Sequence, residues 1–146
     1  PTVIFRYASV VGPRQALNVG VVNLFIDKIK NNQPLTVFGD GENTRPFTFV
    51  DDVVQANMLA ATSTDPAILG DTFNVSSGEG VSINRLIKAI SAKMKKKPEV
   101  IFQAQRTGEI KHMAADTEKI KKRLGFKPAF SVEEGISLTV DYYETK

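Results

Sequence analysis

The sequence predicts an α/β domain, in which strands and helices alternate along the chain and pack in layers. Short β-branched and aromatic runs alternate with segments in which apolar residues recur every three or four positions. Glycine, proline and asparagine cluster between these segments, where the chain must turn. Hydrophobic residues make up 42% of the 146 residues and charged residues 24%, which is enough apolar material for one core. We therefore expect a single soluble globular domain.

The first half of the chain reads as strands that alternate with helices. Residues 2–11 are β-branched and aromatic, and a Gly-Pro step breaks the run. We expect the short runs at 35–38 and 46–50 to form a small strand pair of their own, beside a sheet with some parallel pairing. Asp51 is the expected N-cap of the helix that follows. The expected elements are a strand at 2–11, a helix at 19–30, strands at 35–38 and 46–50, and a helix at 52–63.

The second half continues the alternation and carries clear helix boundaries. After a turn at 78–80, Ser82 stands where a helix N-cap is needed, and Asp116 is expected to cap a later helix. Gly125 is expected to end that later helix, while Ser131 and Glu134 have the spacing of a capping box. The expected elements are a strand at 71–77, a helix from 83 with Ile83, Leu86, Ile87, Ile90 and Met94 on its buried face, a strand at 99–104, and helices at 117–124 and 135–146.

Charge narrows the classes of function. The formal net charge is +3 and the pI is near 9.2, mostly because of lysine-rich stretches at 93–97 and 119–127. A nucleic-acid-binding patch is one interpretation. Solvated helix ends explain the stretches better, because cations complement the C-terminal end of a helix and no aromatic residue interleaves with the first stretch. We therefore expect no nucleic-acid partner.

The side chains that form disulfides and metal sites are almost absent. The sequence has no cysteine and one histidine, His112, so we expect no disulfide and no metal site. A chain without cysteine fits a cytoplasmic protein. No apolar stretch is long enough to cross a bilayer, and residues 1–5 lack the layout of a signal peptide, so we expect no membrane association.

Two patterns imitate enzyme motifs. Gly78, Gly80 and Ile83 follow a strand and open a helix, as in a dinucleotide-binding turn, but Ile83 is too large for the third position. Tyr142 and Lys146 have the Tyr-x-x-x-Lys spacing of short-chain dehydrogenases, but Lys146 is the last residue, and a frayed end cannot hold a proton-transfer geometry. We expect a structural role for both.

The stretch VFGDGENTRPFTFVDDV, residues 37–53, contains an arginine that a plain turn does not need. Arg45 is either a surface side chain in a loop or a ligand for phosphate, which a planar guanidinium binds well. Asp51 and Asp52 could form a catalytic carboxylate pair. Their position between a strand and a helix favours a structural role as helix-capping residues.

Five motifs follow one another along nearly the whole chain. They are FRYASVVGPRQ, LTVFGDGENTRPFTFVDDVVQA, TFNVSSGEGVSI, RTGEIKHMAAD and LGFKPAFSVEEGI. In this order and spacing they resemble the C-terminal half of the NAD-dependent nucleotide-sugar epimerases and dehydratases, in the extended short-chain dehydrogenase/reductase family. Within the family, the match is best with UDP-glucose 4-epimerases and next best with nucleotide-sugar 4,6-dehydratases.

The resemblance implies an architecture for residues 1–146. They would form the C-terminal nucleotide-sugar-binding part of the enzyme, with the last strands of a Rossmann-type sheet and a small mixed α/β substrate-binding lobe. In the family, the glycine-rich NAD turn and the Tyr-x-x-x-Lys pair precede the segment that matches FRYASVVGP. NAD would therefore be bound mainly by an N-terminal Rossmann half, which is absent here and would be the partner of this chain. The full-length enzyme would be a homodimer.

The resemblance also implies a set of binding residues. Arg45 and Arg106 would hold the substrate diphosphate, and Glu109 would accept hydrogen bonds from the ribose; we expect no local partner for either Arg106 or Glu109. Phe38 belongs to the strand that would present backbone groups and an aromatic ring to the base, although it could instead be a core residue. The complete expected set is Ser9, Thr36, Val37, Phe38, Arg45, Arg106, Glu109 and Met113 for a nucleotide-sugar, most simply a UDP-sugar, and Tyr7 and Ala8 beside the nicotinamide.

One motif departs from the family pattern. Where many members have Arg-Tyr-Phe-Asn, this sequence has Arg-Tyr-Ala-Ser at 6–9, so Ser9 replaces a longer asparagine and Ala8 replaces an aromatic residue. The identity of the sugar stays open for this reason. The function implied is an NAD-dependent nucleotide-sugar epimerase in which this part positions the sugar. The alternatives are a 4,6-dehydratase and a non-catalytic module that binds a nucleotide-sugar or nucleic acid. The chain alone is expected to catalyse nothing and to bind no NAD.

Overall fold

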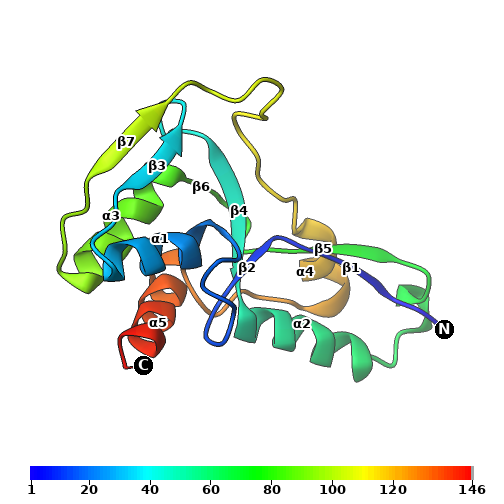
Figure 1. Ribbon diagram of the computed structural model, residues 1–146. Helices are drawn as coiled ribbons and strands as arrows, with labels where there is room; N and C mark the ends of the chain where they lie inside the picture. The colour runs from blue at the N-terminus through cyan, green and yellow to red at the C-terminus, as the bar shows by residue number, and fades with distance from the viewer. Residues whose placement is uncertain (146) are drawn as a thin grey trace.

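The computed structural model describes residues 1–145, which form five α-helices, one short 3₁₀ helix and seven strands (Figure 1). Helices and strands alternate, so the predicted α/β class is confirmed. The elements are β1 (Ile4–Tyr7), β2 (Ser9–Val11), α1 (Val21–Lys30), β3 (Leu35–Phe38), β4 (Thr44–Phe49), α2 (Val50–Ala61), η1 (Pro66–Ile68), β5 (Thr72–Val75), β6 (Gly80–Ser82), α3 (Ile83–Met94), β7 (Val100–Gln103), α4 (Glu118–Leu124) and α5 (Val132–Glu144).

The strands form three small groups. β1 pairs with β5, β2 with β4, and β3 with β7, all in parallel, while β6 pairs with β4 in antiparallel. Figure 1 shows the β3–β7 pair at one end with α1 and α3, and the β1–β5 pair at the other end with α2 and α4. The long strand β4 lies between the two ends, so it connects the two lobes.

The single strand expected at 2–11 is wrong, because the chain changes sheets at Ala8. β1 ends at Tyr7, which lies opposite Val75 of β5, and the Ala8 N–H donates to the Val75 carbonyl over 2.9 Å. One residue further on, Ser9 already lies opposite Phe47 of β4. A continuous β-branched run does not reveal such a crossing, since both halves have the same strand propensity.

The predicted pairing of 35–38 with 46–50 is also wrong. Leu35 of β3 lies opposite Val100 of β7, and β4 bonds instead to β2 and β6. Gly39 and Gly41, both with φ of 77°, turn the chain between β3 and β4 without forming a hairpin. The expected parallel pairing and a separate small pair are both present, but the strand that pairs with β3 comes from much later in the chain.

The helix boundaries follow the capping signals in most places. The Ser82 hydroxyl accepts from the Arg85 N–H, Gly125 ends α4 with φ of 65°, and Ser131 with Glu134 forms the predicted capping box. Asp51 is not an N-cap, because α2 already begins at Val50 after the N-cap residue Phe49.

Two helices in the second half begin at other residues than expected. The N-cap of α4 is Thr117, although the Asp116 carboxylate accepts from the Glu118 N–H over 2.8 Å. The final helix begins at Val132 rather than at 135, because the Ser131 capping box starts it there. The predicted role of Lys146 lies outside the described residues.

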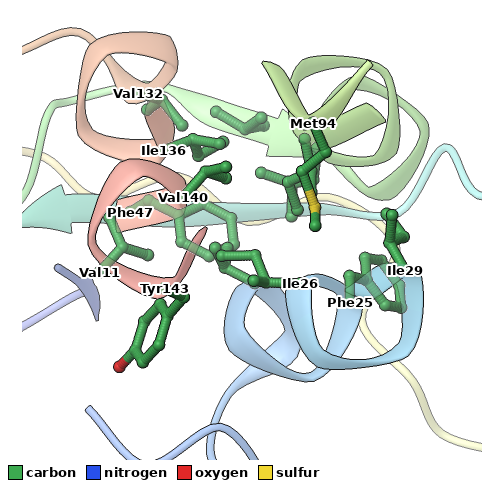
Figure 2. Packing of buried hydrophobic residues seen from close by; sticks show 14 of the residues in the cluster. Val11, Phe25, Ile26, Ile29, Phe47, Met94, Val132, Ile136, Val140 and Tyr143 are labelled. Atoms are coloured by element: carbon green, nitrogen blue, oxygen red, sulfur yellow. The ribbon is translucent and has the colours of Figure 1, made fainter. Parts of the chain in front are cut away.

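Two hydrophobic clusters hold the lobes together. The larger one collects side chains from α1, α3 and α5 around β2, β3, β4 and β6, and Figure 2 shows Ile26, Met94 and Val140 among them pointing toward one another. Leu86 and Ile90 of the predicted helical stripe are 0% exposed in this cluster. The smaller cluster lies between α2, α4, β1 and β5.

The first lysine-rich stretch makes contacts within the chain. Lys96 donates to the carbonyls of Ile29 and Lys30 over 3.1 Å each, at the C-terminal end of α1. Lys93 pairs with Asp141 of α5 over 2.6 Å. These contacts favour the helix-end interpretation of this stretch. No helix within residues 1–145 combines the length and the hydropathy needed to cross a membrane.

Candidate functional site

A pocket of about 340 Å³ lies between α1, β3, the start of β4 and the segment that follows β7. Its walls are apolar on the side of α1 and charged on the side of β4. The lining residues are Val21, Leu24, Phe25, Thr36, Val37, Phe38, Asn43, Arg45, Ile83, Arg106 and Glu109. Six of the eight predicted substrate-binding residues are in this set, although they come from two parts of the sequence, 36–45 and 106–109, that are about 60 residues apart.

Arg45 is the centre of the charged side. Its Nη1 donates to the carbonyls of Thr44 (2.7 Å) and Ile110 (2.8 Å), and its Nη2 pairs with Glu109 over 2.9 Å. Both charged side chains are about a quarter exposed, at 24% each. Arg45 therefore fixes the segment 106–113, which we call the strap, against the edge of the pocket.

The strap has further attachments to β4 and to the turn before it. The Thr44 N–H donates to the Lys111 carbonyl over 2.9 Å, and the Met113 N–H donates to the Thr44 hydroxyl over 3.1 Å. The Lys111 ammonium also lies 3.5 Å from the Asp40 carboxylate. Backbone and side-chain contacts together thus hold an irregular segment in one place.

Arg106 and Glu109 both have partners, and these partners come from distant segments of the chain rather than from the local sequence. The Arg106 guanidinium lies 3.8 Å from the centre of the Phe38 ring, a cation–π distance. Glu109 uses Oε1 for Arg45, while its Oε2 is buried and has no hydrogen-bond partner within residues 1–145. These partners come from β3 and β4, so local sequence could not indicate them.

The strand β3 forms the pocket wall beside the strap. All three residues Thr36, Val37 and Phe38 line the pocket; Val37 is 2% exposed and also belongs to the core, whereas Thr36 and Phe38 on the alternate positions are half-buried. The alternative interpretation of Phe38 as a core residue is therefore not supported, since its ring lies in the pocket wall under Arg106.

Four predicted site residues lie elsewhere. Ser9 lines a separate small pocket of about 40 Å³, which shares Val21 with the larger one. Tyr7 is 44% exposed and its hydroxyl bonds to Asn57 over 3.0–3.1 Å, with Ala8 next to it at the point where the chain changes sheets. Met113 is 37% exposed at the end of the strap and does not line the pocket.

Sequence reasoning missed part of the pocket wall. Val21 and Leu24 belong to the helix expected at 19–30, and both line the pocket, with Leu24 39% exposed. An amphipathic pattern cannot separate core contacts from pocket contacts, since both require apolar side chains. Asn43 was also missed, and its only signal is a position two residues before Arg45, on the same side of an extended chain.

The start of α1 adds donors at the pocket. The helix begins at Val21, and its N-cap residue Gly20 supplies no side-chain hydrogen bond. The first N–H groups of a helix have no partner inside the helix and carry partial positive charge, which suits an anion. Val21 lines the pocket, so the N-terminal end of α1, which favours a negatively charged group, lies at the apolar wall.

The two patterns that imitate enzyme motifs have structural roles in the described part of the chain. Gly80 starts the strand β6, and a Cβ at this position would lie 2.7 Å from the Met113 carbonyl oxygen, so the glycine is needed for packing of the strap. Tyr142 is partly buried against the larger hydrophobic cluster, where its ring meets the Tyr143 ring edge-on with the centres 5.0 Å apart.

The aspartate pair also serves the fold. Asp52 is 1% exposed and accepts from the Ala129 N–H over 2.7 Å, which ties α2 to the chain before α5. Burial raises the pKa of the Asp52 carboxyl. Asp51 is exposed to solvent. The structural interpretation is supported, although the carboxylate joins two segments rather than capping its own helix.

A larger cavity, of about 630 Å³, lies between the ends of β5, α4 and α5. Glu79, Asp116, Glu118 and Lys121 contribute its charged side chains. None of the predicted site residues lines it. Size alone therefore does not single out the functional site, and the 340 Å³ pocket is the one in which Arg45 and Arg106 lie together with the Phe38 ring.

Comparison with known proteins identifies relatives of the chain. Residues 1–76 match the model of the NAD dependent epimerase/dehydratase family. A UDP-glucose 4-epimerase from Mycolicibacterium smegmatis is 35% identical over 141 residues, which are 95% of this chain and 44% of that protein. The chain thus spans less than half the length of this relative.

Solved structures give the same result. The UDP-glucose 4-epimerase of Thermotoga maritima with UDP-glucose has a TM-score of 0.88 and 36% identity, covering 98% of this chain and 46% of that one. The UDP-glucuronic acid 4-epimerase of Bacillus cereus, in complex with UDP-glucuronic acid and NAD, has a TM-score of 0.89 and 31% identity, covering 98% and 45%. The Rossmann-type strands and the small mixed lobe expected from the resemblance are thus confirmed. The chain belongs to the NAD-dependent epimerase/dehydratase family.

Proposed function

We propose that this chain is the nucleotide-sugar-binding part of an NAD-dependent nucleotide-sugar 4-epimerase that resembles UDP-glucose 4-epimerase. One observation carries the proposal: six residues expected to bind the nucleotide, from the two distant segments 36–45 and 106–109, line a single pocket. A UDP-sugar is the favoured substrate, because the similar structures reported above were solved with UDP-sugars.

Each wall of the pocket has a role in this proposal. The diphosphate binds Arg45 and Arg106, whose guanidinium groups offer several donors to phosphate oxygens. Thr36, Val37 and Phe38 hold the base, and Glu109 accepts from the ribose hydroxyls. The buried Oε2 of Glu109, which has no partner within residues 1–145, supports the last assignment, since a hydroxyl donor would satisfy it.

The remaining expected residues would bind beyond the nucleotide. Ser9 hydrogen-bonds the sugar, and its pocket shares Val21 with the nucleotide pocket, which supports a sugar that extends from one to the other. Tyr7 and Ala8 lie beside the nicotinamide, and Met113 lies near the nucleotide. Binding of the nucleotide by remote contacts orients the sugar for reaction.

The cofactor in this proposal is NAD, held mainly by an N-terminal half of the protein. When bound, it takes a hydride from a sugar carbon and returns it to the opposite face. Within residues 1–145, the glycine turn at Gly78 and Gly80 has the bulky Ile83 where a pyrophosphate-binding turn has a small residue, which argues against NAD binding there. This chain would therefore contact only the nicotinamide end.

The proposed partners follow from the same reasoning. The N-terminal half would extend the sheet at β1, which lies at the edge of its pair and exposes Ile4 and Tyr7 at 48% and 44%. A homodimeric full-length enzyme and a cytoplasmic location complete the proposal, the latter supported by the cysteine-free composition. A nucleotide-sugar 4,6-dehydratase is the second candidate, because the matching family model covers dehydratases as well.

The test is calorimetry and a coupled assay on the full-length protein. We expect UDP and UDP-glucose to bind, and UDP-glucose to be converted to its 4-epimer with bound NAD. Loss of water from the sugar instead of epimerisation would favour the dehydratase. Binding of UDP-sugars without turnover would favour a non-catalytic module, and no binding of any nucleotide-sugar would contradict the proposal.

A further inference from the structure

Asn43 is a buried polar side chain without a partner in the wall of the nucleotide pocket. It is 4% exposed and lines the pocket, yet its side-chain amide makes no hydrogen bond within residues 1–145. Its backbone carbonyl is satisfied, since it accepts from the Ile83 N–H over 3.3 Å. The Asn43 amide atoms are not among the wholly buried side-chain atoms that lack a partner, so the amide is partly accessible from the pocket. An accessible amide without a partner in a pocket wall can donate to and accept from a ligand.

The alternation of side chains along the extended segment places the Asn43 amide on the side of the pocket. Asn43 and Arg45 are two positions apart in an extended segment, so they lie on the same side, and both line the pocket. Thr44, between them, lies on the other side, where its hydroxyl accepts from the Met113 N–H over 3.1 Å. The alternation therefore places Asn43 and Arg45 on the pocket side, where Arg45 also contacts the strap, and Thr44 on the opposite side.

The amide lies between the two ends of the proposed nucleotide site. A Cβ placed on Gly39, the residue after β3, would lie 4.0 Å from the Asn43 Nδ2. β3 is the strand assigned to the base, and Arg45 is assigned to the diphosphate. We propose that Asn43 hydrogen-bonds the nucleoside of the substrate, through its base carbonyl and imide groups or its ribose hydroxyls. This inference rests on the proposed function and adds a residue to it.

A role for Asn43 in holding the turn is not needed. The Asn84 side chain already donates to the Asp40 carbonyl over 3.0 Å and to the Glu42 carboxylate over 2.6 Å. The Asn84 N–H also donates to the Gly41 carbonyl over 3.0 Å. The turn between β3 and β4 is therefore fixed by another asparagine, which leaves the Asn43 amide available for a ligand with both its donor and its acceptor.

The experiment compares Asn43→Ala and Asn43→Leu with the unchanged full-length protein, by calorimetry with UDP, 2′-deoxy-UDP and pyrophosphate. We expect UDP to bind about tenfold more weakly to Asn43→Ala, and pyrophosphate to bind equally well, because the arginines remain. The melting temperature without ligand should stay unchanged or rise in both variants, because no hydrogen bond is lost. Asn18→Ala, at an exposed asparagine outside the pocket, should change none of these values.

The outcomes separate this inference from the proposed function. If the unchanged protein binds UDP and Asn43→Ala binds it equally well, Asn43 is not a ligand residue and the proposed function stands. If Asn43→Ala has a lower melting temperature and loses affinity for UDP and for pyrophosphate equally, the inference is also overturned. Asn43 then has a structural role. If the unchanged protein binds no UDP, both fail. A weaker effect of Asn43→Ala on 2′-deoxy-UDP than on UDP would assign the bond to the ribose, and an equal effect would assign it to the base.

Discussion

Arg45 joins β4 to the strap through one guanidinium. It contacts its own strand at Thr44 and the strap at Glu109 and Ile110, and it lines the pocket. The same side chain is therefore proposed to hold the strap and the substrate diphosphate. A lysine cannot do both, because it offers a point charge instead of a planar fork of donors.

We predict that Arg45→Ala weakens UDP binding by about 1.5–3 kcal/mol, the range of a hydrogen bond to a charged group. Arg45→Lys should recover only part of this loss. Calorimetry with UDP measures both variants. The control is Arg123→Ala, which removes surface ion pairs to Asp65 and Asp71 outside the pocket and should leave UDP affinity unchanged. Unchanged affinity in Arg45→Ala would remove this arginine from the site.

Asp52 makes the stability of the fold depend on pH. Burial raises the pKa of its carboxyl above the ordinary value, so the folded chain favours the protonated form. The stabilisation by that protonated form is complete at low pH and is lost as the pH rises through the raised pKa. At neutral pH the folded protein therefore carries the cost of a buried charge, which the neutral amide of the variant Asp52→Asn would avoid.

The variant Asp52→Asn keeps an oxygen for the Ala129 N–H and removes the titration. We predict that the melting temperature of Asp52→Asn, relative to the unchanged protein, rises between about pH 3 and about pH 7. Asp51→Asn, at an exposed neighbour, is the control for the change in net charge. If the difference in melting temperature between Asp52→Asn and the unchanged protein stays constant or falls as the pH rises, Asp52 does not titrate as described.

Single residues could be predicted only where a motif or a local rule fixes them. Arg45 and Phe38 came from motifs, and Ser82 from the N-cap preference. The pairing of Arg45 with Glu109 joins residues far apart in the sequence, so no local rule contains it. Asn43 has no motif, and only its burial beside the pocket reveals it.

At the scale of elements, the strap depends on the close approach of β6. Gly80 opens β6, and a Cβ there would lie 2.7 Å from the Met113 carbonyl oxygen and 3.0 Å from the Thr44 hydroxyl. Both neighbours belong to the attachment of the strap to β4. Any side chain at this position must displace the strap, since backbone atoms cannot move aside alone.

We predict that Gly80→Ala lowers both the melting temperature and the affinity for UDP, because it displaces the segment that carries Arg106 and Glu109. The matched control is Gly70→Ala. Gly70 has φ of 80° and open space around it, so alanine there strains the backbone by about 1 kcal/mol without reaching the pocket. Melting curves and UDP calorimetry should show lower stability in both variants and weaker binding only in Gly80→Ala. Normal binding in Gly80→Ala would contradict the dependence on the strap.

Elements were predictable where their own sequence fixes them. The stripe on α3 and the capping box of α5 depend on spacings of three and four residues, and both are present. Strand partners depend on the whole fold, so the pairing of β3 with β7 and the crossing at Ala8 were not predictable from local pattern. The short strand β6 was read as a turn, because glycine hides strand propensity.

At the scale of the whole molecule, the 146 residues should not act alone. β1 has an open edge, and Ile4, Tyr7 and Leu69 are exposed by 44–49%. Open strand edges tend to pair with another chain. We predict that the isolated chain self-associates or folds marginally, binds no NADH and has no epimerase activity.

Size-exclusion chromatography, NADH fluorescence titration and a coupled epimerase assay on the purified chain measure these properties. The full-length protein under the same conditions is the control, and should bind the cofactor and turn over substrate. Micromolar NADH binding or turnover by the isolated chain would show that the active site lies within these residues, and that the proposed division of labour is wrong.

The central claim is that the pocket between α1, β3, β4 and the strap holds a nucleotide-sugar. The most direct test is a crystal structure of the full-length protein with UDP-glucose. We expect the diphosphate to lie within hydrogen-bond distance of Arg45 and Arg106, with the base against β3. A ligand bound instead in the 630 Å³ cavity near Glu79 and Lys121, or away from Arg45, would contradict it.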